Sequence, residues 1–189
     1  MRIAVINSKG GVGKTPLAFS IAKDFGLSLQ TNDNSVVTQI YNKANFCDPC
    51  TLTDDCVYDF GGFVAIGVLQ ILSECDCVIM PVTPKINSIF KAAETYNQIK
   101  TYLKKVIVLV TDIVDNNDLK IIVDALKGAG FSNEVEYFVL KRSAAFENAI
   151  ANGMSFAELY NQSGLSRSQY KSFYTQYYEL LSALKGFKK

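Results

Sequence analysis

The sequence predicts an α/β fold, in which a mostly parallel sheet carries helices on both of its faces. Short runs rich in β-branched residues alternate with longer segments of helical period, which is typical of consecutive strand–helix–strand units. The chain of 189 residues can also bury a sizeable core, because 49% of its residues are hydrophobic and only 20% are charged. We expect a single domain over residues 1–189.

The elements can be assigned in chain order from these patterns. The β-branched runs predict strands at residues 2–7, 28–31, 56–59, 77–81, 106–111 and 135–140. Helices are expected between them, at residues 15–25, 63–73, 87–103, 117–129 and 143–152. A last helix should cover residues 166–185, because Ser166 can cap its beginning and Gly186 can end it. It forms most of a basic segment, residues 163–189, which we expect to pack on the domain.

The composition excludes several kinds of chemistry. Histidine is absent, which excludes Ser-His-Asp catalysis and histidine metal ligands. The formal net charge of +1 argues against a uniformly basic nucleic-acid-binding protein, but the charge is unevenly distributed. Residues 44–84 contain six acids and no lysine or arginine, whereas residues 163–189 contain five basic residues and one acid. The basic residues are therefore concentrated in particular segments rather than spread evenly along the chain.

Neither a membrane span nor a secretory signal is predicted. The apolar runs are far shorter than the ~20 residues that cross a bilayer, and the first strand begins at residue 2. Five cysteines, an odd number, then indicate free thiols in a reducing compartment, and we expect a cytoplasmic protein. A thiolate metal site is the alternative for these residues, which are Cys47, Cys50, Cys56, Cys75 and Cys77.

The strongest functional signal is the glycine-rich segment 8–15, SKGGVGKT, between the first strand and the first helix. It matches the phosphate-binding pattern G-x-x-x-x-G-K-[ST], except that Ser8 replaces the first glycine. Backbone N–H groups of such a loop surround phosphate oxygens, and the following helix presents its positive end. The lysine neutralises the β- and γ-phosphates, and the hydroxyl ligates Mg²⁺. The predicted nucleotide-binding residues are Gly10, Gly11, Val12, Gly13, Lys14 and Thr15. The fold is thus predicted to be a three-layer, Rossmann-like P-loop NTPase.

Lys9 makes this loop more specific. The segment KGGVGKT resembles the deviant Walker A box of the ParA/MinD family of dimerising P-loop ATPases, and the similarity extends over roughly residues 1–160. The resemblance implies that Lys9 reaches across a nucleotide sandwich to the phosphates bound by a partner subunit. Lys9 and Lys14 are therefore expected to be catalytic.

Two further segments resemble this family and supply acidic residues. Segment 31–35, TNDNS, stands in the place of the family's D-x-D-P-Q segment and keeps only its second acid, Asp33. By analogy Asp33 orients the attacking water and is catalytic, while a simple Asx-turn residue is the alternative. Segment 54–62, DDCVYDFGG, resembles the Walker B strand, which implies that Asp59 holds Mg²⁺ through water and that Gly62 senses the γ-phosphate.

Later segments resemble the partition branch of the family. Residues 75–84, CDCVIMPVTP, resemble a family strand that ends in a P-V-x-P-like turn, and Thr111 stands where an adenine-contacting Asn is usual. Residues 141–149, KRSAAFENA, resemble the R-x-S-x-A-F segment of ParA proteins. The resemblance is closest to small ParA-type partition ATPases that lack an N-terminal helix-turn-helix domain.

This resemblance implies a slow, ATP- and Mg²⁺-dependent switch ATPase that forms a homodimer in its ATP state. Its expected role is plasmid or chromosome partition, with non-specific DNA binding, a ParB-like centromere-binding partner and possible association with the nucleoid. The DNA-binding surface would combine the basic C-terminal segment with other lysines, and a merely solvated lysine face is the alternative. Those other lysines are Lys85, Lys91, Lys100, Lys104 and Lys105.

Two other functions stay open at this point. A MinD-like positioning ATPase would insert its last helix into a membrane through Leu180, Leu181, Leu184 and Phe187, although the same spacing describes packing on the domain. A tyrosine kinase of the same fold would use a tyrosine-rich tail, although those tyrosines also have the spacing of a packing face. The tyrosines are Tyr170, Tyr174, Tyr177 and Tyr178.

Overall fold

The computed structural model describes residues 1–62 and 66–187, without the side chains of residues 66 and 116–118. Within these residues the chain forms a seven-stranded sheet in the order β3-β2-β4-β1-β5-β6-β7. Every pairing between neighbouring strands is parallel. The strands are β1 (Arg2–Ile6), β2 (Ser28–Thr31), β3 (Ala44–Phe46), β4 (Cys56–Phe60), β5 (Cys77–Val82), β6 (Val106–Ile113) and β7 (Glu136–Lys141).

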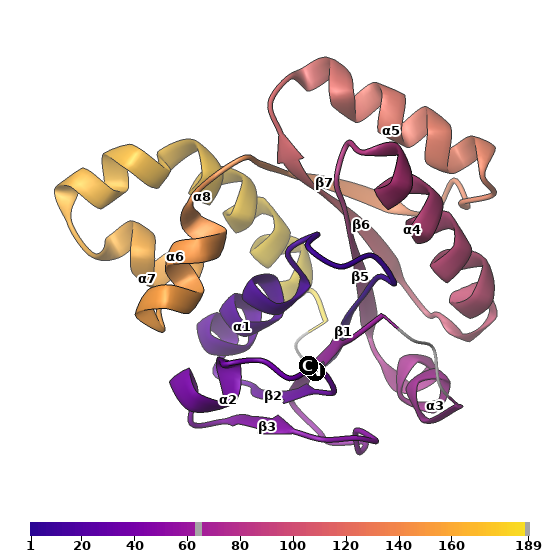
Figure 1. Cartoon of the computed structure of the whole chain (residues 1–189), viewed down its shortest axis with the longest axis horizontal. Coiled ribbons are helices and arrows are strands. Elements are labelled where there is room, and N and C mark those ends of the chain that lie inside the picture. Colours follow the sequence, from indigo (N-terminus) through magenta and orange to yellow (C-terminus); the bar gives the residue numbers. More distant parts are fainter. Residues whose placement is uncertain (63–65, 188–189) are drawn as a thin grey trace.

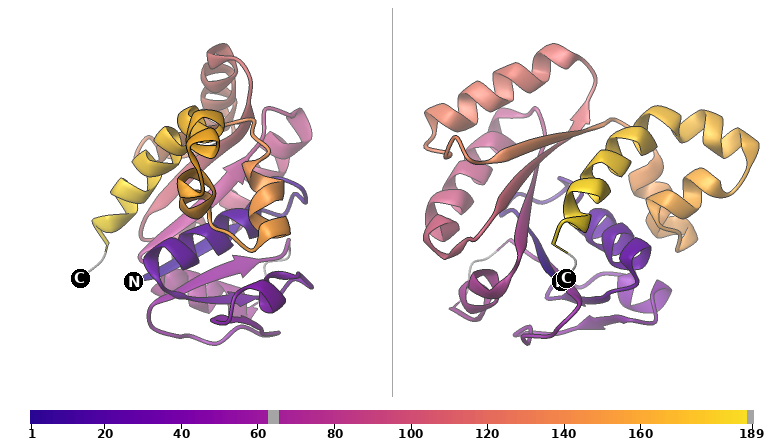
Figure 2. Two further views of the ribbon diagram at one scale, coloured as in Figure 1. Left: turned by 90° about the vertical axis from the view of Figure 1, so that its left-hand side faces the viewer. Right: turned by 180° about the vertical axis from the view of Figure 1, so that it is seen from behind.

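Helices cover both faces of the sheet, as Figure 1 and the two turned views in Figure 2 show. One face carries α1 (Lys14–Phe25), α2 (Val37–Ile40), α6 (Ala145–Asn152), α7 (Phe156–Asn161) and α8 (Gly164–Lys185). The other face carries α3 (Ile66–Glu74), α4 (Ile86–Ile99), the 3-10 helix η1 (Lys100–Tyr102) and α5 (Asn116–Gly128). The predicted three-layer α/β fold is therefore confirmed.

Each central strand contributes alternate side chains to two separate cores. In β1, Ile3 and Val5 face the core under α1 and α8, whereas Ala4 and Ile6 face the core under α3, α4 and α5. All four are almost completely buried. A strand buried on both faces must be apolar along its whole length, which explains why the strands were recognisable as continuous apolar runs.

The helix α8 packs on the sheet through a row of apolar residues. Phe173, Tyr177, Leu180 and Leu184 are buried, and the Lys141 N–H of β7 donates a hydrogen bond to Gln176 Oε1 over 2.9 Å. The ring of Phe156, from α7, lies 5.0 Å from the rings of both Phe173 and Tyr177. The last helix is thus part of the core on this face.

Most element predictions are confirmed, and most of their ends shift by no more than two residues. The strand predicted at 135–140 covers Glu136–Lys141, and the helix predicted at 87–103 ends at Ile99 before η1. The beginning of the helix predicted at 63–73 lies outside the described residues. β3, α2 and α7 were not predicted. The expected cap of the last helix was wrong: the helix begins at Gly164, and Ser163 caps it by accepting a hydrogen bond from the Ser166 N–H.

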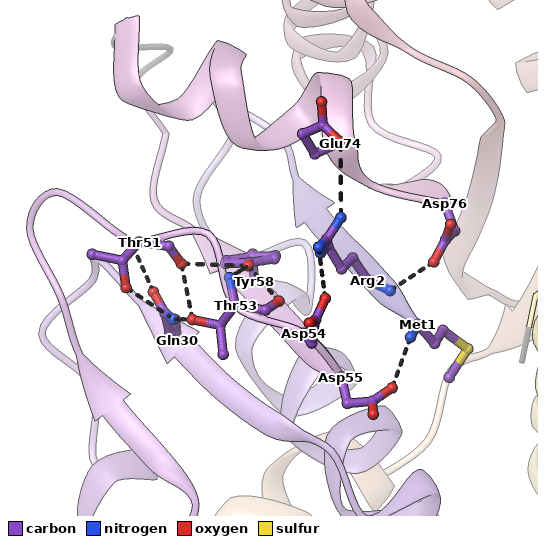
Figure 3. Close-up of polar contacts among 10 residues, drawn as sticks. All are labelled: Met1, Arg2, Gln30, Thr51, Thr53, Asp54, Asp55, Tyr58, Glu74 and Asp76. Carbon is purple, nitrogen blue, oxygen red and sulfur yellow. Dashed lines mark hydrogen bonds and ion pairs between the residues drawn. The ribbon is translucent and has the colours of Figure 1, made fainter. Parts of the chain in front are cut away.

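Polar contacts hold the segment that leads into β4 (Figure 3). Gln30 donates to Thr53 Oγ1 over 2.7 Å and accepts from the Thr51 N–H over 2.8 Å. The Thr53 N–H donates to the buried Tyr58 hydroxyl over 2.8 Å.

The amino end of β1 is also held by ionic contacts in the same view (Figure 3). The Met1 ammonium pairs with Asp55 over 2.7 Å, and Arg2 pairs with Asp54 over 2.6 Å. Such exposed pairs contribute only ~0–1 kcal/mol each, but here they join the amino ends of β1 and β4. Both strands carry site residues at their other ends.

All five cysteines are free thiols, as predicted. Burial raises the pKa of Cys50 and of Cys56 to about 12, so both are protonated at neutral pH. Within the described part of the chain, no group of three or more cysteine, aspartate, glutamate or histidine side chains could hold a metal ion. The same residues contain no helix long and apolar enough to cross a membrane.

Candidate nucleotide-binding site

The glycine loop connects the carboxyl end of β1 to the first turn of α1. Gly13 is the N-terminal cap of α1 with φ of 89°, and Gly11 has φ of 73°, a region that favours glycine. Lys14 is 8% exposed, and its ammonium donates to the carbonyl oxygen of Lys9 over 3.1 Å. The two glycines let the backbone turn sharply just before α1. The loop therefore lies at the end of the helix that carries a partial positive charge.

Gly13 is also constrained by its surroundings. A Cβ at this position would lie 2.6 Å from Cε1 of Phe146, a residue of α6. The backbone angle and the lack of space both exclude a side chain at Gly13. The glycine loop is therefore in direct contact with Phe146, which belongs to the aromatic cluster of α6, α7 and α8.

Asp59 lies beneath the loop, at the end of β4. It is 1% exposed, and its Oδ2 accepts hydrogen bonds from the hydroxyls of Thr15 over 2.7 Å and Thr31 over 3.3 Å. Burial raises the pKa of Asp59 to about 6, while the two hydroxyls and the ammonium of Lys14 act in the opposite direction. Its Oδ1 is buried and has no hydrogen-bond partner among the described residues. An unpartnered carboxylate oxygen next to a threonine hydroxyl fits the oxygen ligands that Mg²⁺ prefers.

The glycine loop is tied to α4 through Ser8. The Thr95 hydroxyl donates to Ser8 Oγ over 3.0 Å, and the Ser8 N–H donates to Thr95 Oγ1 over 3.2 Å. Asn7 joins the ends of two strands, because its amide donates to the Pro81 carbonyl over 2.7 Å. The serine that departs from the phosphate-binding pattern thus connects the loop to a helix on the opposite face from α1.

The segment after β2 approaches the segment after β4. Asn32 accepts a hydrogen bond from the Gly61 N–H over 2.6 Å, and the Asp33 N–H donates to Thr31 Oγ1 over 3.1 Å. A Cβ at Gly62 would lie 2.8 Å from the Ser8 carbonyl oxygen. Thr31 therefore contacts both Asp33 and Asp59, and Gly62 lies directly against the glycine loop.

A cavity of about 670 Å³ opens at this carboxyl edge of the sheet. It is lined by residues 10–16 and Asp33, and by residues that lie at or after the ends of β5, β6 and β7. Thr111 is buried there, and its hydroxyl donates to the Val12 carbonyl over 3.1 Å. Ligands of parallel α/β sheets bind at this edge, so the cavity is the candidate nucleotide site.

An ion pair at the ends of β6 and β7 forms part of the cavity wall. Asp112 has φ of 63°, and its two carboxylate oxygens accept from Nε and Nη2 of Arg142 over 2.6 and 3.3 Å. Phe146 lies on the same wall. The cavity wall thus includes a planar guanidinium and an aromatic ring, two groups on which a nucleotide base can stack.

The structure brings most of the predicted site residues together. The loop residues from Gly10 to Thr15, with Asp33 and Thr111, line the cavity, and Asp59 contacts Thr15. Lys9 does not line the cavity, and its ammonium has no hydrogen-bond or ion-pair partner among the described residues. Sequence reasoning missed the cavity residues that come from other strand ends: Thr83, Lys85, Asp112, Arg142, Ser143, Phe146 and Glu147. The signal for Thr83, Lys85, Asp112 and Arg142 was their position one to four residues after a predicted strand, whereas Ser143, Phe146 and Glu147 lie in a segment predicted as a helix.

Comparison with known proteins gives structural matches only. No family model and no curated protein matches the sequence. The fold is similar to a septum site-determining protein MinD complexed with Mg-ADP from Pyrococcus horikoshii, with 11% identity, a TM-score of 0.62 and coverage of 100% of this chain and 98% of that chain. It is also similar to a ParA family ATPase from Chlorobium tepidum, with 12% identity, a TM-score of 0.61 and coverage of 88% and 95%.

A third similar structure is a putative plasmid partition protein from Borrelia burgdorferi bound to AMPPNP, with 13% identity, a TM-score of 0.56 and coverage of 78% and 89%. The chain therefore has the fold of the MinD and ParA-type P-loop ATPases. This is the fold that the resemblance of the glycine loop implied.

Proposed function

We propose that this chain is a ParA/MinD-type ATPase, a single P-loop domain over residues 1–189 with the basic segment 163–189 packed on it. The observation that carries the proposal is the contact between Thr15 and Asp59, which places a buried carboxylate with one free oxygen beneath the glycine loop. ATP would occupy the cavity with its phosphates at the loop. Thr15 would hold Mg²⁺ directly and Asp59 through water.

Residues of this chain would position the phosphates and the water. N–H groups of residues 10–15 and the Lys14 ammonium bind phosphate oxygens, and Gly62 contacts the γ-phosphate end. Asp33, held through Thr31, orients the attacking water. Mg²⁺, when bound, would neutralise charge that develops on the phosphates. A site of this kind hydrolyses ATP slowly, because few groups stabilise the transition state.

Lys9 would complete the site of a second copy. Its ammonium lies outside the cavity of its own chain and has no partner among the described residues. In a dimer that encloses ATP, this charge would meet the partner's phosphates. ATP then favours the dimer and hydrolysis favours monomers, because only the triphosphate state gains this contact.

The DNA-binding surface we propose is a stripe on α8. Arg167, Lys171, Tyr174, Tyr178 and Lys185 follow one another at spacings of three, four or seven residues, which puts them on one helix face. Tyr174 is half-buried and the other four are exposed, and the Lys185 ammonium lies 5.4 Å from the Tyr178 ring. The stripe spans ~27 Å, enough to follow a duplex backbone with its cations.

The other lysines considered for DNA binding do not extend this stripe. Lys91 pairs with Glu94, and Lys105 pairs with Glu136. Lys91 belongs to α4, which covers the opposite face of the sheet from α8, Lys105 directly precedes β6, and Lys85 lines the cavity. We therefore restrict the proposed DNA-binding surface to the stripe on α8.

The packing of α8 argues against the two alternative functions. Leu180, Leu181 and Leu184, which a membrane-inserting helix would expose, are at most 7% exposed. Tyr170 and Tyr177 are buried too, so half of the tyrosine-rich tail is core. A partition ATPase with a ParB-like partner, located on the nucleoid through its DNA binding, agrees better with this arrangement.

DNA binding can be tested with fluorescent duplex DNA of arbitrary sequence in the presence of Mg²⁺ and ATP. We expect binding that weakens as salt rises. The slope of log affinity against log salt should decrease in magnitude by about one for each phosphate-contacting cation that the substitution removes from the dimer. Lys171→Ala and Arg167→Ala should weaken binding, while Lys104→Ala, on the far side of the sheet, should not. Binding that is independent of salt, or equal in all three variants, would contradict the proposal.

A further inference from the structure

Lys85 occupies an unexpected place in the structure. It lies directly before α4 and lines the nucleotide cavity, together with Thr83. It was expected at a DNA-binding surface, but the cavity that it lines is the one formed by the glycine loop. A lysine at this position is part of neither the glycine loop nor the Walker B segment.

The backbone that carries Lys85 is firmly held. The Lys85 carbonyl accepts hydrogen bonds from the N–H groups of Ser88 over 2.8 Å and Ile89 over 3.1 Å. The Thr83 N–H donates to Ser88 Oγ over 3.0 Å. The strand before it is β5, which pairs with β1. The side chain therefore starts from a fixed point beside the strand that leads into the glycine loop.

Lys85 differs from the other two cations that line the cavity in whether its charged group has a partner. Lys14 donates to the loop carbonyl of Lys9, and Arg142 is held by Asp112. The Lys85 ammonium has no hydrogen-bond or ion-pair partner among the described residues. It is the cation of this cavity that is free to bind an anionic ligand without breaking an existing contact.

We propose that Lys85 is a phosphate-binding residue, whose ammonium contacts oxygens of the β- or γ-phosphate of the nucleotide held in its own chain. This inference rests on the proposed ATP-binding function and adds a second cation from the same subunit to Lys14. Lys85 then shares the charge of the bound triphosphate with Lys14, whereas Lys9 serves the partner.

The test is calorimetric titration of the purified chain with ATP, ADP and AMP in the presence of Mg²⁺. We expect Lys85→Ala to weaken binding of ATP and ADP about tenfold, as for loss of one hydrogen bond to a charged group, and to change AMP binding much less. Lys85→Arg should restore most of the affinity. Lys100→Ala, a lysine just after α4 and outside this cavity, is the matched control and should bind like the wild type.

The outcomes separate this inference from the proposed function. Failure of the wild type to bind ATP, or equal binding by Lys14→Ala, would overturn the proposed function and with it the role of Lys85. If the wild type binds and Lys14→Ala does not, unchanged ATP affinity in Lys85→Ala overturns the role of Lys85 alone. An equal loss for AMP and ATP also overturns it, because the contact would then not be with the phosphates lost in AMP.

Discussion

At the scale of single residues, Ser8 illustrates how a departure from a motif can have a structural cause. The phosphate-binding pattern has glycine at this position, yet the Ser8 hydroxyl accepts a hydrogen bond from Thr95, and its carbonyl lies against Gly62. The same residue thus contacts α4 on one side and the segment after β4 on the other. Movement of the glycine loop on nucleotide binding would therefore displace α4 and the segment after β4 as well.

The close approach of Gly62 to Ser8 predicts a steric effect of substitution. In Gly62→Ala the new Cβ would lie 2.8 Å from a backbone oxygen, so one of the two segments must move. We expect the free energy of unfolding to fall by about 1–3 kcal/mol, measured by urea denaturation without nucleotide. The control is Gly10→Ala, in the same region, where a Cβ would meet nothing within 4 Å. Equal stability of the two variants would show that the described contact does not matter.

The site residues predicted from the sequence belong to continuous motifs, whereas those that were missed come from separate strand ends. Residues 10–15 and Asp59 could be predicted, because a continuous pattern encodes each segment and its place at a strand end. Lys85 and Arg142 could not, because each approaches the cavity from a separate strand end, and only the order of strands in the sheet brings them to the loop. Sequence position alone does not contain that order.

At the scale of elements, the central strands were predictable and the small elements were not. β1 and β5 are buried on both faces and read as apolar runs, whereas β3 has only three residues, two of them exposed. α7 was overlooked although its signal is present: Ser155 and Glu158 form a capping box at its start. β3 is too short and too exposed for its pattern to be recognised, whereas α7 could have been predicted from its capping box.

The buried face of α8 predicts a contrast between two leucines of one helix. Leu180 is 0% exposed and Leu165 is 79% exposed. We expect Leu180→Ala to lower the free energy of unfolding by about 2–5 kcal/mol, because it leaves a cavity in the core. Leu165→Ala should change it by no more than ~0.5 kcal/mol. Thermal or urea unfolding would measure both, and a small effect at Leu180 would mean that α8 is not a core element in solution.

Asp24 connects three helices and predicts a pH dependence. At the end of α1 it accepts hydrogen bonds from Ser155, the cap of α7, and from Tyr177 of α8 over 2.8 Å. Burial raises the pKa of Asp24 above its usual value of about 4, although the two hydrogen bonds oppose the shift. Between the unfolded and the folded pKa, the folded state binds more protons, so this group's stabilising contribution is lost as pH rises.

Asp24→Asn should remove this part of the pH dependence. The difference in unfolding free energy between wild type and variant should therefore shift in favour of the variant as pH rises from 4 through the folded pKa. Urea denaturation at several pH values measures it, with Glu134→Gln, an exposed carboxylate, as the control. A constant difference across the series would contradict a raised pKa for Asp24.

At the scale of the whole molecule, the sheet separates two surfaces with different tasks. Its carboxyl edge holds the nucleotide cavity, whereas the exposed stripe of α8 lies on one face, behind the aromatic cluster that contacts Gly13. In the proposed account, two copies join at the edge that carries Lys9, and dimerisation doubles the basic surface offered to DNA. Dimerisation would therefore link ATP binding at the sheet edge to DNA binding at α8.

The most direct test is the molar mass in solution, measured by light scattering after size exclusion, with Mg²⁺ and a slowly hydrolysed ATP analogue or ADP. We predict a dimer with the ATP analogue and a monomer with ADP for the wild type. Lys9→Ala should bind the analogue in a separate titration yet stay monomeric. A wild type that remains monomeric with the analogue, or a Lys9→Ala variant that dimerises as well as the wild type, would contradict the central claim.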